Sequence, residues 1–193
     1  MSKDVVLRIK GSDEPGHTRK VSSAMAWLLR ENGYFVGRAV KQKAINQAIK
    51  SVAALNQQVA KANIVLSLDL SFKRTDDGIM AVEFVASEAP TERPSEFKEY
   101  KVSSKDSEDE KAISRLATAI ALPCNENKGI RLSCIGPDSV YKAVMASIVA
   151  KGYIYANGFE SVFIPNWRTI GENKKVSLIN IEFFGKKKNF EVP

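Results

Sequence analysis

The stretch VGRAVKQKAINQAIK, residues 36–50, takes the chain directly from a strand pattern into a helix pattern. Residues 34–40 have the composition of a β-strand, and a helix is predicted from Lys41 to about Gln57, because apolar residues recur every three or four positions. The same stretch collects cations and amides with no acid between them. These polar residues are Arg38, Lys41, Lys43, Asn46, Gln47 and Lys50. Arg38 and Lys41 lie near the predicted helix start, beside unpaired backbone N–H groups, which favour phosphate.

The spacing within the predicted helix separates a polar face from an apolar one. Lys43, Gln47 and Lys50 are three or four residues apart and share one face. Ile45 and Ile49 fall on roughly the opposite face, which can pack on a sheet. We therefore expect an exposed cationic stripe that meets solvent or a ligand, the plainer alternative being an ordinary solvated face.

Working outward, strand and helix patterns alternate in the same order in both halves of the chain. The first half has predicted strands at 5–10, 34–40, 62–72 and 79–87, and helices at 18–31 and 41–57. The second half has predicted strands at 99–104, 129–136, 159–167 and 174–185, and helices at 108–122 and 137–152. Each half is thus β-α-β-α-β-β, with an offset of about 95 residues between the halves. The fold class predicted from this order is α+β.

A proline-containing, charged segment, EAPTERPSEF (88–97), separates the halves and has the composition of a linker. We expect a first domain at 1–90, a linker at 91–97, a second domain at 98–188 and a frayed tail at 189–193.

Four motifs of the second half resemble, in order, the stage V sporulation protein S family. They are YKVSSKDS (100–107), LSCIG (132–136), KAVMASIVAKGYI (142–154) and GFESVFIPNW (158–167). In the first half, AINQAIKSVA (44–53) resembles the central motif of that family. GRAVKQKAI (37–45) is similar to the strand-to-helix junction of Alba proteins, which share the fold. The resemblance implies two tandem Alba-like domains that bind RNA or DNA and pair as an intramolecular pseudo-dimer, with further self-association left open.

The two copies depart from the family pattern in complementary ways. The glycine-rich junction of the family is replaced by residues 41–43 in the first half and is kept as Gly136-Pro137-Asp138 in the second. Tyr141 and Lys142 stand where the first half has its two amides. We therefore expect the two sites to bind unequally.

Composition agrees with a polyanionic partner. The 193 residues include 29 Lys plus Arg against 22 Asp plus Glu, which gives a formal net charge of +7 and a pI of about 9.4. Such a balance favours nucleic acid or an anionic membrane surface. The two cysteines, Cys124 and Cys134, lack the spacing of a metal site. With no signal-peptide pattern and no apolar run long enough to span a membrane, we expect a cytoplasmic protein of a bacterium or a bacterial virus.

The predicted hairpins and two aromatic residues extend the candidate interface. Cations flank the two hairpin turns: Lys73, Arg74, Arg168, Lys174 and Lys175. Tyr141 and Trp167 would stack on unpaired bases, or, as the alternative, cover the edge of a core. Trp27 lies within an apolar helix pattern, and we expect it to be packed.

No constellation of residues indicates catalysis, and we expect no cofactor or metal. His17 is the single histidine, in a polar loop, and no phosphate-binding glycine motif is present. We expect a non-enzymatic nucleic-acid-binding protein with little sequence specificity. Single-stranded RNA or mRNA is favoured because amides and aromatic groups suit unpaired bases. The alternatives are an architectural protein on duplex DNA and a protein–protein assembly module without nucleic acid.

Overall fold

A computed structural model describes residues 5–170 and 176–188 as a mixed α+β fold built on one eight-stranded sheet. The first half contains β1 (Val6–Ile9), α1 (His17–Asn32), β2 (Phe35–Ala39), α2 (Lys41–Val59), the 3₁₀ turn η1 (Ala60–Ala62), β3 (Leu66–Arg74) and β4 (Met80–Glu88). The second half contains β5 (Phe97–Val102), α3 (Glu110–Asn125), β6 (Gly129–Cys134), α4 (Pro137–Ala156), β7 (Phe159–Ile170) and β8 (Val176–Lys187). The α+β class is confirmed, and the element order expected for each half is found in both.

The strands run in the order β1-β2-β4-β3-β7-β8-β6-β5, so the sheet is continuous from one half into the other. Within each half the first two strands are parallel and the remaining neighbours antiparallel. Counted from its outer edge, each half has its first, second, fourth and third strand in succession. The third strands, β3 and β7, join the halves through one antiparallel bridge, Leu68 to Phe163.

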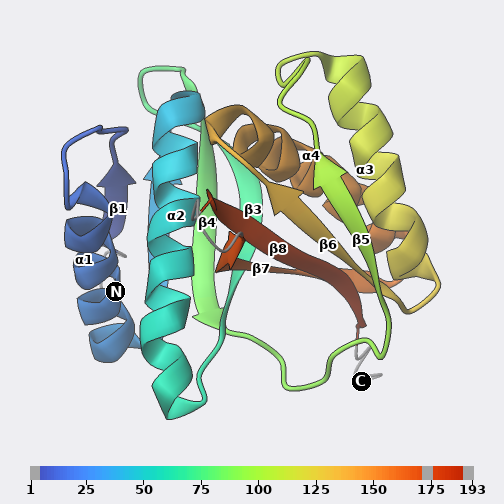
Figure 1. Cartoon of the computed structure of the whole chain (residues 1–193), viewed down its shortest axis with the longest axis horizontal. Helices are drawn as coiled ribbons and strands as arrows, with labels where there is room; N and C mark the ends of the chain where they lie inside the picture. The colour runs from blue at the N-terminus through green and yellow to red at the C-terminus, as the bar shows by residue number, and fades with distance from the viewer. Residues whose placement is uncertain (1–4, 171–175, 189–193) are drawn as a thin grey trace.

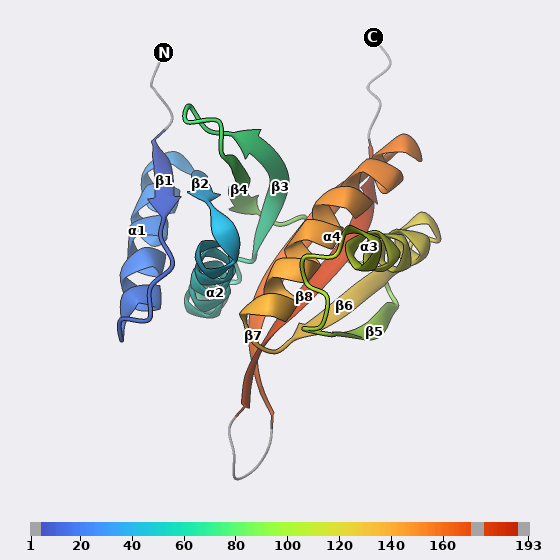
Figure 2. The same ribbon diagram turned by 90° about the horizontal axis from the view of Figure 1, so that it is seen from above.

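The sheet twists strongly between the halves, so the helices lie on different sides of the strands in the view of Figure 1 although α2 and α4 meet at the centre (Figures 1 and 2). In the view of Figure 1, α1 and α2 lie in front of β3 and β4, whereas α4 lies behind β6. At the centre α2 packs against β7 and α4 of the other half, and α4 packs against β3. One apolar core therefore runs through both halves, and it contains Leu55, Val144 and Phe163, each at most 1% exposed.

Local signals account for some of the helix ends. α1 ends at Gly33, whose φ of 76° lets its N–H donate to the carbonyl oxygen of Leu29. The Asp109 side chain caps the start of α3 by accepting two backbone N–H groups. α4 was expected to end at Gly152 but continues to Ala156, because Ile154 is fully buried in the core and holds the last turn.

The segment between β4 and β5 packs on the sheet. Ala89 joins Val162, Ile164 and Phe184 in a small apolar cluster. The Arg93 guanidinium lies 5.4 Å from the centroid of the Phe184 ring, and desolvation by burial lowers its pKa. The connection between the halves is thus ordered by contacts with the second half.

The expected packing of Trp27 is wrong, because its side chain is 56% exposed. The buried face of α1 consists of Ser22, Met25 and Leu28. At 100° per residue, Trp27 lies well away from both Met25 and Leu28 around the helix. Trp27 therefore lies on the outer face of α1, although it is apolar and belongs to a helix pattern.

Candidate nucleic-acid interface

The strand-to-helix junction of the first half holds a lysine in a backbone conformation that favours glycine. Lys41 has a φ of 66° at the first residue of α2, and it is exposed. The left-handed conformation costs an L-residue with a Cβ about 1–2 kcal/mol. The equivalent residue of the second half is Gly136, with a φ of 83°. The junction therefore keeps the same backbone shape in both halves and carries a cation in the first.

The two junctions lie side by side. The Gln42 Nε2 group donates to Asp138 Oδ1 over 2.5 Å, and these residues belong to the first turns of α2 and α4. The two candidate sites thus form one surface at the centre of the molecule. Because Asp138 contributes a carboxylate to it, the cationic part of this surface is on the side of the first half.

Arg38 forms an ion pair with Glu83. Arg38 Nη2 lies 2.5 Å from Glu83 Oε2 on the neighbouring strand β4, and the two side chains are 20% and 19% exposed. Its charge is therefore compensated, and a phosphate would have to displace Glu83 to reach it. A phosphate contact by Arg38 stays a prediction that this ion pair opposes.

Lys43 is exposed and pairs with Asp13, whose side chain is 86% exposed. The loop after β1 lies against this lysine, since a Cβ on Gly11 would fall 2.5 Å from Lys43 Cγ. An ion pair between such exposed groups contributes only about 0–1 kcal/mol. Lys43 can therefore exchange Asp13 for a phosphate at little cost. Lys50, further along α2, is half-buried.

The expectation that the amide side chains of α2 are exposed is wrong. Asn46 and Gln47 are only 8% and 6% exposed. The Gln47 Nε2 group donates to Thr18 Oγ1 on α1 over 2.8 Å, so α1 covers this face of α2. Asn46 Oδ1 is buried without a hydrogen-bond partner among the described residues. Because α2 is enclosed by α1 on one side and by the second half on another, its middle polar residues are buried, whereas Gln57 and Gln58 at its end are exposed.

In the second half, Lys142 is also buried rather than on the surface, at 8% exposure. Its Nζ group donates to the carbonyl oxygen of Lys105 over 2.9 Å, and so holds the loop between β5 and α3. Tyr141 is half-buried, and burial together with the negative charge of Glu108 raises its pKa. Trp167 packs against the core, in agreement with the alternative of a covered core edge.

Three of the five cations expected beside the hairpin turns lie among the described residues. Lys73 and Arg74 are exposed at the end of β3, and Arg168 is exposed on β7. Lys174 and Lys175 lie outside the described residues.

Sequence reasoning missed a pocket of about 930 Å³ at the carboxyl ends of β5 and β6. Tyr100, Lys101, Lys105 and Ile135 line it together with Arg168. A signal was available in YKVSSK, because two lysines flank a serine pair at the end of a predicted strand. Their convergence with Arg168 depends on the fold and could not be read from the sequence.

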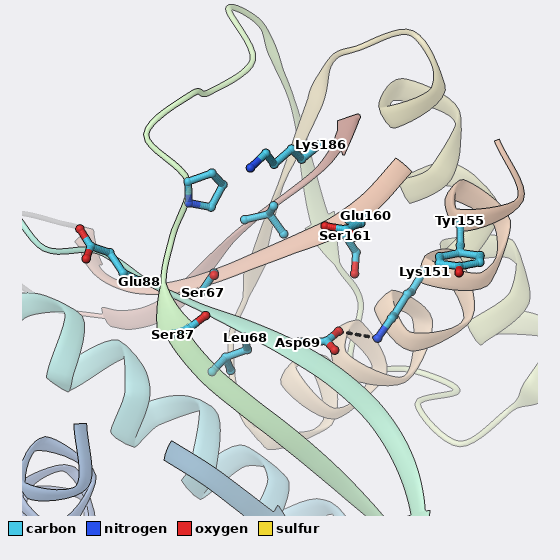
Figure 3. A pocket seen from close by; sticks show the side chains of 12 residues that line it. Ser67, Leu68, Asp69, Ser87, Glu88, Lys151, Tyr155, Glu160, Ser161 and Lys186 are labelled. Atoms are coloured by element: carbon cyan, nitrogen blue, oxygen red, sulfur yellow. Dashed lines mark hydrogen bonds and ion pairs between the residues drawn. The ribbon is translucent and has the colours of Figure 1, made fainter. Parts of the chain in front are cut away.

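A second hollow, of about 500 Å³, lies where the halves join (Figure 3). Lys151 of α4 and Asp69 of β3 point toward each other across it and form an ion pair. Glu88, Glu160 and Lys186 also line this hollow. With three carboxylates against two ammonium groups, it is unsuited to a polyanion.

Within residues 5–170 and 176–188, no three His, Cys, Asp or Glu side chains gather as a metal site would require. No helix in the same part of the chain has both the length and the apolar character needed to cross a bilayer.

Comparison with protein families finds one match. Residues 99–183, from β5 into β8, match the model of the family Stage V sporulation protein S (SpoVS). The second half therefore contains a domain similar to those of this family, whereas the corresponding likeness of the first half stays a prediction. A search of curated proteins gives no match to the chain.

Proposed function

We propose that this chain is a non-enzymatic nucleic-acid-binding protein, with single-stranded RNA favoured over duplex DNA, whose two Alba-like halves form an internal pseudo-dimer. The observation that carries the proposal is Lys41, an exposed cation held at φ 66° on the first residue of α2. Strain of this kind persists where the surroundings enforce it, and it gathers at functional sites. At this position the ammonium group accompanies the unpaired N–H groups of the helix start, an arrangement that suits phosphate.

The pseudo-dimer is supported by reciprocal contacts between the halves. Leu68 and Phe163, which pair across the join, are equivalent residues at the offset of about 95 found in the sequence. The Asn56 amide donates to the Pro165 carbonyl oxygen over 2.9 Å, and the equivalent residue Lys151 donates to the equivalent carbonyl, of Leu70, over 3.3 Å. A two-fold interface repeats each contact in this way.

Burial of Asn46 and Gln47 removes the amides as a reason to favour RNA. The preference for unpaired bases rests instead on Tyr100, which is 40% exposed beside Lys101 at the end of β5. Exposed aromatic rings next to cations are typical of surfaces that bind single strands.

The proposal is tested by the anisotropy of a labelled single-stranded RNA and of a DNA duplex, titrated with protein at several salt concentrations. The informative variant is Lys41→Glu, and its matched control is Lys61→Glu. Lys61 is also exposed, and it lies beyond the other end of α2, roughly 28 Å from Lys41. We expect saturable binding that weakens steeply with salt. Lys41→Glu should weaken it about tenfold or more, and Lys61→Glu less than twofold.

Absence of saturable binding by the wild-type protein at low salt would refute the proposal and favour an assembly module. Equal effects of the two Glu variants would show that charge alone, and not the junction, determines affinity. Tighter binding of the duplex than of the RNA would reverse the stated preference.

A further inference from the structure

Each half has a pocket at the same place in the fold, where its first two parallel strands end beside its hairpin. In the first half this pocket measures about 440 Å³, and Arg8, Lys10 and Arg38 line it. Asp76 and Asp77 of the hairpin turn line it as well. With Arg38 already paired to Glu83, two cations face two carboxylates, so this pocket has little attraction for an anion.

The second-half pocket is larger, about 930 Å³, and differently charged. Lys101, Lys105 and Arg168 bring three exposed cations to it from β5, the following loop and β7. Glu99 is the one carboxylate among its described lining residues, and it lies 3.4 Å from Arg131. No carboxylate of the described residues pairs with the three cations.

Among the described residues, no ion pair joins the acids near this loop to the three cations. Asp106 lines an adjoining hollow between β5, α3 and α4, which shares Tyr100, Lys101 and Lys105 with the second-half pocket. Arg131 engages Glu182 as well as Glu99, at 3.0 Å, so these three groups form a closed network on the sheet face. The cations of the second-half pocket are therefore available to an external anion.

The same pocket exposes apolar surface. Tyr100 is 40% exposed on β5, which forms one edge of the sheet; its ring lies on the opposite face of β5 from Lys101 and reaches the pocket across this edge. Ile135 is 55% exposed, directly before Gly136 at the start of α4. Because Asp138 contacts Gln42, the pocket opens close to the junction that carries Lys41. In the first-half pocket no aromatic residue is among the described lining residues.

We propose that the second-half pocket, lined by Tyr100, Lys101, Lys105, Ile135 and Arg168, holds an unpaired nucleotide of a single-stranded nucleic acid, whereas its first-half counterpart does not. The base stacks on Tyr100, and the three cations contact the flanking phosphates. The inference rests on the proposed function and assigns its base-contacting site to one half of the molecule.

The test uses the full chain, a labelled oligouridylate of twelve nucleotides, and inorganic polyphosphate as a probe that lacks bases. Tyr100→Leu keeps an apolar side chain and removes the ring. It should weaken binding of the oligouridylate about tenfold, within the range measured for one stacked base, and change binding of polyphosphate less than twofold. Lys101→Ala and Arg168→Ala should weaken both probes and reduce the salt slope by about one each.

The matched controls are Arg8→Ala and Lys10→Ala in the first-half pocket, which should change both affinities less than twofold. Circular dichroism and thermal unfolding establish that each variant is folded. If the wild-type protein binds RNA but Tyr100→Leu binds equally well, or if the controls lose as much affinity as Lys101→Ala, this inference fails and the proposed function stands. If the wild-type protein binds neither probe, both fail.

Discussion

Leu68 of β3 and Phe163 of β7 face each other across the join between the two halves, and they are the same residue position in each half. Both are at most 1% exposed. A contact between equivalent positions is what a self-complementary interface produces. In the proposed pseudo-dimer the partner surface belongs to the same chain, so the connecting segment would keep the two surfaces at high effective concentration.

Removal of the Asn56 side chain should destabilise this join. Asn56 accepts the N–H of Leu66 and donates to the carbonyl oxygens of Leu66 and Pro165, so it ties β3 to β7. Asn56→Ala leaves these buried groups unpaired, and we expect a loss of about 2–4 kcal/mol in the free energy of unfolding. The exposed neighbour Gln57 is the control, since Gln57→Ala should change it by less than about 0.5 kcal/mol. Equal losses in urea unfolding would contradict this role.

Replacement of Lys41 by glycine should stabilise the fold and weaken binding. Glycine removes the cost of a Cβ at φ 66° but adds backbone entropy to the unfolded chain, so the net gain is about 0.5–1 kcal/mol. The reciprocal change, Gly136→Ala, should destabilise by about 1 kcal/mol or more because alanine would adopt a φ of 83°. Thermal unfolding measures both. A destabilised Lys41→Gly would show that the lysine makes compensating contacts.

The two thiols should be protected from reagents until the protein unfolds. Burial raises the pKa of Cys124 and of Cys134 to about 12, so neither forms appreciable thiolate at pH 8 in the folded state. A chromogenic disulfide reagent should react with neither thiol in buffer and with both in concentrated urea. Rapid reaction of either thiol in the native protein would mean that the surrounding core opens readily.

The same pKa shifts predict a stability that falls at alkaline pH. Above the unfolded thiol pKa of about 8.5 the unfolded chain loses thiol protons that the folded protein retains. The unfolded state then binds fewer protons, so the free energy of unfolding decreases as pH rises from about 9 toward 12. Urea unfolding at pH 7.5 and pH 10 measures the decrease. A variant with both cysteines replaced by alanine should show a smaller decrease between these two pH values, and an identical decrease would exclude the thiols as its cause.

Local patterns predicted the order of elements well because hydrophobic periodicity records which face of each segment is buried. They failed where burial depends on a distant segment. The spacing of Gln47 indicated a polar face, but α1 covers that face through Thr18. Lys142 looked like a surface cation, but its partner is the carbonyl oxygen of Lys105, in a loop that precedes α3.

The candidate site shows the same division between local and distant information. The positive charge near Lys41 was evident from composition, whereas the partner of Arg38 is 45 residues away and becomes visible only when β2 and β4 pair. The second-half pocket joins Tyr100 to Arg168, which belong to strands on opposite sides of β6 and β8 in the sheet order. No spacing rule connects residues brought together in this way.

The pair of Arg38 and Glu83 provides a direct test of which cations meet the phosphates. The two side chains are about one-fifth exposed, so Arg38→Met alone leaves a partly buried carboxylate without its partner and should cost about 1–2 kcal/mol. The double variant Arg38→Met, Glu83→Met keeps the net charge and replaces the pair by apolar side chains of similar size. It should recover stability to within about 1 kcal/mol of the wild-type protein.

In binding experiments the double variant should retain wild-type affinity within twofold and an unchanged salt slope, because the charge of Arg38 is already neutralised by Glu83. Lys41→Met, which removes an exposed cation at the same junction, should lower the slope by about one. A double variant that is folded and loses one unit of slope would show that Arg38 leaves Glu83 for a phosphate when nucleic acid binds. The ion pair would then be a resting state of the junction that opens on binding.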